Sequence, residues 1–164
     1  MKYLLLLTIS SYSYGYGQSS LPKDHYVILP YEKDAYTSLA KNSIPASLTD
    51  SDFAIIDEVL SVCMDKHNHE QTTEYKKMIK KFPKNGFQLK DFVIELKRYY
   101  RQYMVVKNAK GEKEVWVNCF CSIQYMDYWR KQIVFVMDGG NCFFNVRINI
   151  TKKTFVDFEV NGEA

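Results

Sequence analysis

Four cysteines are the residues of this chain best suited to covalent chemistry. Cys119 and Cys121 lie two positions apart on one face of a predicted strand, so they are poor partners for each other. Cys142 could bridge to either of them, or all four thiols, including Cys63, could pack as small apolar side chains. The alternation of neighbouring residues predicts that all four point into the core. No metal is expected, because Cys-x-Cys lacks a second ligand pair at zinc-site spacing.

A cysteine and a histidine four residues apart, Cys63 and His67, could form a thiol nucleophile with its base on one helix face. Cys63 also falls within an apolar stripe, where burial raises a thiol pKa and makes the sulfur inert. His67 and His69 could bind a metal, but a histidine in a last helical turn is explained more simply by the exposed carbonyls there. Because no paired-carboxylate, nucleophile-elbow or Walker pattern is present, we expect no catalytic residue and no cofactor.

Aromatic and arginine side chains are concentrated between residues 99 and 130, and these types are enriched at binding hot spots. They predict a binding surface on the outer face of a sheet. The alternative is that the N-terminal residues cover this face. The aromatic side chains would then serve only to pack against them. The predicted surface residues are Tyr99, Arg101, Tyr103, Trp116, Phe120 and Trp129.

Lysines clustered between residues 76 and 84 could meet anionic lipid, nucleic acid or an acidic partner. Glu70, Glu74 and nearby aromatics dilute this charge, so the sequence favours a solvated helix face. The net charge of +3 is well short of the basicity expected of a nucleic-acid-binding domain, and no nucleic-acid partner is expected.

The first seventeen residues match a Sec-type secretory signal peptide. Lys2 precedes an apolar run over residues 4–9, and Gly15 and Gly17 supply the small residues required before a cleavage at Gln18. The run is far shorter than the roughly 18 residues that span a bilayer, so no stable membrane insertion is expected. The mature protein is therefore expected to be secreted or periplasmic.

The 164 residues, 46% apolar and 25% charged, are typical of one folded domain and exclude wholesale disorder. We place that domain at residues 49–164. Residues 18–48, the N-terminal arm, contain three of the four prolines and predict an extended segment with one short strand at 26–29 that Pro30 ends.

A helix is predicted over residues 50–66, with Thr49 and Asp52 as a capping box and Leu48 and Phe53 as the hydrophobic staple. A second helix is predicted at 73–82, ended by Pro83, and residues 89–97 fit either a helix or an extended chain. The apolar stripe of the first helix comprises Phe53, Ile56, Leu60, Cys63 and Met64.

From residue 99 onward the sequence alternates as strands do. Strands are predicted at 99–107, 112–121, 133–137 and 142–150, with turns at 108–111 and 138–141. A last strand is predicted with Val156, Phe158 and Val160 inward. One helix packed on a curled antiparallel sheet of about five strands is an α+β, two-layer fold.

The element order resembles the cystatin-like group, including NTF2-like proteins. Three segments, at 111–121, 138–145 and 160–164, resemble a group of small exported bacterial proteins of unknown function. This resemblance covers roughly the last 70 residues and implies a bacterial, exported origin, but it supplies no activity and no site residue.

We therefore expect an exported, non-catalytic protein that binds another protein, as an inhibitor-like module does, through the aromatic sheet face. The alternative is a small-ligand carrier with a pocket between helix and sheet. A hydrolase with unrecognised residues is a third interpretation, which convergent titratable groups in a cleft would favour.

Overall fold

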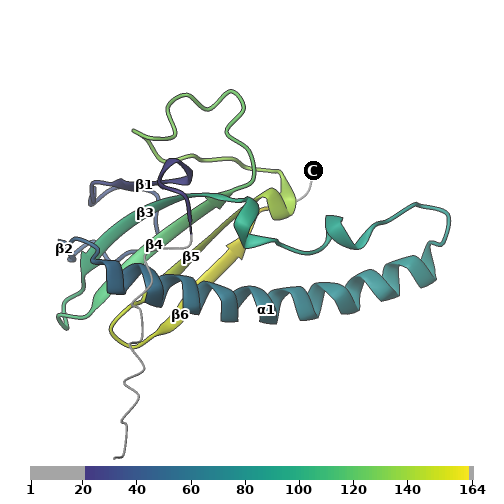
Figure 1. Cartoon of the computed structure of the whole chain (residues 1–164), viewed down its shortest axis with the longest axis horizontal. Coiled ribbons are helices and arrows are strands. Elements are labelled where there is room, and N and C mark those ends of the chain that lie inside the picture. The colour runs from purple at the N-terminus through teal and green to yellow at the C-terminus, as the bar shows by residue number, and fades with distance from the viewer. Residues whose placement is uncertain (1–20, 163–164) are drawn as a thin grey trace, which may run out of the picture.

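The structure, a computed structural model, describes residues 21–162 and confirms the α+β class (Figure 1). One long helix lies across one face of an open six-stranded sheet. The signal peptide predicted at residues 1–17 lies outside the described residues. The helix is α1 (Asp50–Lys81), and the strands are β1 (Tyr26–Leu29), β2 (Ile44–Pro45), β3 (Tyr100–Lys107), β4 (Lys113–Phe120), β5 (Phe143–Asn149) and β6 (Thr154–Val160).

The sheet is mixed, although the sequence predicted it to be antiparallel throughout. Its strand order is β1-β3-β4-β5-β6, and the short β2 pairs with the end of β3. β1 runs parallel to β3, with Tyr26 opposite Arg101, while the other pairings are antiparallel. The predicted strand at 26–29 is confirmed, and it takes the edge position that Pro30 allows.

Helix α1 begins as the sequence predicts and continues further than expected. The Thr49 amide donates to the Asp52 carboxylate at 2.7 Å, and the Asp52 amide donates to Thr49 Oγ1 at 3.3 Å. Two helices were predicted, but residues 67–72 contain no proline or glycine to separate them, and α1 runs unbroken for 32 residues. It ends just before Pro83, as predicted.

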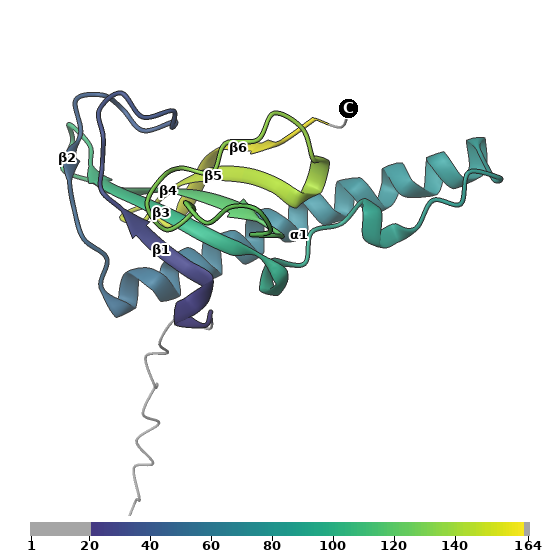
Figure 2. The same ribbon diagram turned by 90° about the horizontal axis from the view of Figure 1, so that it is seen from above.

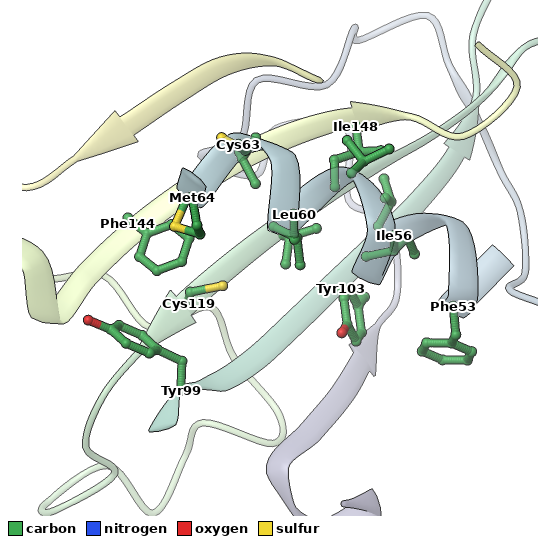
Figure 3. Packing of buried hydrophobic residues seen from close by; sticks show 14 of the residues in the cluster. Phe53, Ile56, Leu60, Cys63, Met64, Tyr99, Tyr103, Cys119, Phe144 and Ile148 are labelled. Carbon is green, nitrogen blue, oxygen red and sulfur yellow. The ribbon is translucent and has the colours of Figure 1, made fainter. Parts of the chain in front are cut away.

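The apolar stripe of α1 forms the main core with the inner face of the sheet, the face that α1 covers (Figure 3). Ile56 and Leu60 are fully buried, and Phe53 is 9% exposed. The sheet contributes alternate residues of β3, β4 and β5, and those of β4 and β5 were predicted to point inward, whereas Tyr103 of β3 was predicted to lie on the outer face. The contributed residues include Tyr103, Val115, Val117, Cys119, Phe144, Val146 and Ile148.

The outer face of the sheet is covered by the N-terminal arm and by a long connection over residues 121–139. The prediction of a strand at 133–137 is wrong, because this segment is an irregular loop that crosses the outer face of the sheet. Two buried polar side chains hold its backbone. Gln102 Oε1 accepts from the Val134 amide at 2.9 Å, and Asn118 Nδ2 donates to the Val134 carbonyl at 2.8 Å.

The prediction of a hairpin turn at 138–141 is also wrong, because no strand precedes these residues. Gly139 has a φ of 110°, and a Cβ there would lie 2.6 Å from the Phe143 ring. In β6, Val156 is 42% exposed instead of buried, because a bulge with Asp157 at a φ of 51° shifts the register. Phe155, Phe158 and Val160 therefore face the core.

Candidate functional site

The six predicted surface residues are all buried, with exposed fractions between 0 and 5%. They also divide between the two faces of the sheet. Tyr103 lies opposite Val117 and points toward α1, whereas Trp116 lies opposite Met104 and points outward. The structure therefore does not bring Tyr99, Arg101, Tyr103, Trp116, Phe120 and Trp129 together on one exposed surface.

The inward-facing members of this set make structural contacts. Arg101 Nη1 lies 2.7 Å from Asp57 Oδ1 on α1, forming a mostly buried ion pair. The Tyr99 hydroxyl donates to the Asn141 carbonyl at 2.7 Å. Burial raises the pKa values of Tyr99 and Tyr103 to about 12, so both phenols stay protonated at neutral pH.

The alternative of a Cys63 nucleophile with His67 as its base is not favoured by the surroundings of the two side chains. Burial raises the pKa of Cys63 to about 11, so its thiol is protonated at neutral pH. Burial lowers the pKa of His67, and its ring packs against Phe158 with 5.2 Å between centroids. The expectation that His67 lies in a last helical turn is wrong, because α1 continues to Lys81.

One disulfide joins Cys121 to Cys142, with 5.0 Å between their Cα atoms. This resolves the predicted choice between Cys119 and Cys121. Cys63 and Cys119 are buried and reduced. Cys121 does not point into the core as predicted, because β4 ends at Phe120 and the next residue is already exposed.

The outer face carries a cleft of about 260 Å³ that the sequence did not predict, here called the outer cleft. Three large side chains on its rim are more than half exposed: Tyr36 at 77%, Phe135 at 56% and Met137 at 80%. The rings of Tyr36 and Phe135 meet edge to face at 5.1 Å. Trp116 also lines the cleft and donates its indole N–H to Asn145 at 3.2 Å.

A larger cleft of about 550 Å³, the end cleft, lies where the segment after α1 meets the start of β5. Charged groups of both signs surround it, and Tyr99 is the only predicted surface residue that lines it. Its lining also includes the disulfide and two glycines. The charged lining residues are Lys90, Asp91, Glu95, Arg98 and Asp138.

Two carboxylates that the sequence did not pair, Glu112 and Glu114, share the side chains of Asn108 and Asn149. Lys152 Nζ lies 2.7 Å from Glu112, and Arg147 lies 3.3 Å from Glu114. Hydrogen bonding from Lys152, Asn108 and Asn149 lowers the pKa of Glu112 to about 2. Each carboxylate therefore forms an ion pair with a basic side chain. This arrangement is typical of a structural role.

Two properties of the described residues bear on metal ions and membranes as partners. Within residues 21–162, no group of three or more His, Cys, Asp or Glu side chains is placed to hold a metal ion. None of the helices in this range is both long and apolar enough to cross a membrane.

No protein-family model, curated protein or solved structure matches this chain. The resemblances to cystatin-like folds and to exported bacterial proteins therefore stay predictions.

Proposed function

We propose that this protein is a non-catalytic binding module whose outer cleft receives a surface of another protein. The observation that carries this proposal is the rim formed by Tyr36, Phe135 and Met137. Aromatic residues and methionine are enriched in protein interfaces, and hot spots cluster where large apolar side chains can be fully desolvated. The binding surface thus differs in membership from the one predicted from sequence, and it keeps only Trp116.

The dimensions of the outer cleft favour a protein over a small ligand. Its volume of about 260 Å³ is below the range, from about 300 Å³ upward, in which small-molecule pockets usually fall. The side chains of its rim protrude. A partner that covers them from outside therefore removes more apolar surface from water than a ligand held inside the cleft would. The indole N–H of Trp116 is already hydrogen-bonded to Asn145, so covering this ring leaves its donor satisfied.

The experiment compares capture of extracellular proteins from the producing cells by matched variants. The triple variant Tyr36→Ser, Phe135→Ser, Met137→Ser removes the rim, and Tyr125→Ser removes a ring that is 89% exposed elsewhere. A partner retained by the wild type and by Tyr125→Ser is expected to bind the triple variant at least about thirtyfold more weakly. Equal retention by the triple variant would overturn the proposal.

We further propose that residues 1–17 are removed during export, as the sequence pattern predicts. The disulfide between Cys121 and Cys142 supports an oxidising compartment, since such bonds persist outside the cytosol. Intact-mass measurement of the protein recovered outside the cytosol is expected to give a chain beginning at Gln18. Recovery of the full chain from the cytosol alone would contradict this.

A second candidate function, transport of a small ligand, is favoured by the end cleft. Its volume of about 550 Å³ suits a small molecule, and both charge signs line it. The interface between helix and sheet, where the sequence placed this pocket, is filled by Ile56, Leu60 and Tyr103. A ligand of the end cleft is expected to raise the melting temperature of the wild type but not of Arg98→Ala, with Arg130→Ala as the control.

A further inference from the structure

The second half of α1 projects beyond the sheet (Figures 1 and 2). The buried residues of α1 all lie between Asp52 and Met64. From residue 69 the helix is covered only by the chain that returns alongside it, where Phe92 packs against Tyr75 at 5.4 Å and against Phe87 at 6.0 Å. We call residues 69–95 the projection.

The end of the projection is strongly basic. Between Glu74 and Asp91 the chain has six lysines, no acidic residue and no arginine. All six lysines are exposed. Lys77 forms an exposed ion pair with Glu74 at 3.0 Å. Within residues 21–162 the other five form no ion pair: Lys76, Lys80, Lys81, Lys84 and Lys90.

Apolar side chains are exposed among these lysines. Ile79 is 37% exposed, Phe82 39% and Leu89 41%. Lys81 Nζ lies 5.0 Å from the centre of the Phe82 ring. Lysine can lay its aliphatic stem along apolar surface and keep its ammonium group in the polar layer, so the two residue types can enter a lipid headgroup region together.

We propose that the tip of the projection docks on the surface of a bilayer that contains anionic phospholipid. The lysines supply attraction to the phosphates, and Ile79, Phe82 and Leu89 supply apolar contact with the boundary between headgroups and acyl chains. This contact is peripheral, with no part of the chain crossing the bilayer. It also leaves the outer cleft available, so it does not depend on the function proposed above.

The same features make a nucleic acid a poorer fit. Phosphates of a nucleic acid would engage the lysines but leave the exposed apolar side chains in water, and this segment has no arginine for paired contacts. An acidic protein surface would also engage the lysines. These two partners are therefore the alternatives that the experiment must separate from a lipid surface.

The experiment is co-sedimentation of the full chain with vesicles of phosphatidylcholine alone or mixed with equimolar phosphatidylglycerol. Binding is expected only to the mixed vesicles and should weaken as salt is added. The variant Lys76→Gln, Lys80→Gln, Lys84→Gln is expected to partition about a hundredfold less, at roughly fivefold per lysine. The matched control Lys33→Gln, Lys110→Gln, Lys131→Gln removes three exposed lysines elsewhere and should bind as the wild type does.

A second variant tests the apolar contribution. Phe82→Ser, Leu89→Ser keeps every lysine and is expected to lose at least tenfold in vesicle binding, while circular dichroism shows an intact helix. Absence of binding to mixed vesicles would overturn the proposal. So would equal binding of wild type and Phe82→Ser, Leu89→Ser, particularly if both bind DNA or polyglutamate equally well, because attraction of lysines alone would then explain the result.

Discussion

The Asn68 side chain pairs with both backbone polar groups of Ile94. Its Nδ2 donates to the Ile94 carbonyl at 2.9 Å, and its Oδ1 accepts from the Ile94 amide at 2.8 Å. Asn68 stands on α1 near the place where the helix leaves the sheet. This pair therefore fixes the returning chain against the helix at the base of the projection.

Replacing Asn68 by alanine is expected to lower the free energy of unfolding by about 1–3 kcal/mol, because both polar groups of the buried Ile94 lose their partner. Hydrogen exchange of the Ile94 amide should become faster. His69→Ala is the control, since it brings alanine to the next, exposed position of the same helix. Equal protection of Ile94 in Asn68→Ala and the wild type would contradict this assignment.

Gln102 has the corresponding role on the outer face and is fully buried. Its Nε2 donates to the carbonyls of Trp129 and Gln132, and its Oε1 accepts from Asn118 and from the Val134 amide. Gln102→Leu leaves these groups unpaired, so we expect a loss of about 3 kcal/mol or more in unfolding free energy.

Chemical denaturation measures this loss, and limited proteolysis within residues 121–139 should become faster. Gln124→Leu is the matched control, because Gln124 is exposed in the same connection. An unchanged cleavage rate in Gln102→Leu would show that other contacts hold the connection.

Local signals were sufficient for much of the fold. The capping box at Thr49 and Asp52 placed the start of α1, and the alternation in β4 separated its inner from its outer residues. Continuation of α1 through residues 67–72 was not predicted, although no proline or glycine there breaks the helix. C-terminal to Met64, helix α1 contributes no buried residue to the core.

The candidate site could be predicted only in part. The turn at 108–111 fixes the register that places Tyr103 beside Val117, so the sequence held a signal that Tyr103 faces α1. The rim of the outer cleft had no such signal. Phe135 reaches the surface because Gln102 and Asn118 bind the backbone of its connection, and long-range pairing of this kind leaves no periodic pattern.

Glu112 makes stability depend on pH in acid. Its pKa is lowered from 4.5 to about 2 in the folded protein by the bonds from Lys152, Asn108 and Asn149. As pH falls between these values, the unfolded chain takes up a proton that the folded chain does not, so the free energy of unfolding decreases.

Glu112→Gln removes this uptake. Urea denaturation at a series of pH values should therefore show a stability difference between wild type and variant that is largest above pH 4.5 and shrinks toward pH 2. Glu32→Gln is the control, since Glu32 is exposed and forms no ion pair within residues 21–162. A difference that stays constant over this range would refute the ionic role of Glu112.

Thiol accessibility distinguishes the two kinds of cysteine. Burial raises the pKa of Cys63 to about 11 and that of Cys119 to about 12, so neither forms a reactive thiolate in the folded protein. A chromogenic thiol reagent is expected to label none of the four cysteines natively, two after unfolding, and four after unfolding with a reductant. Val62→Cys, at a position 58% exposed on the same helix, should add one rapidly labelled thiol. Four labelled thiols without reductant would mean that Cys121 and Cys142 are not joined.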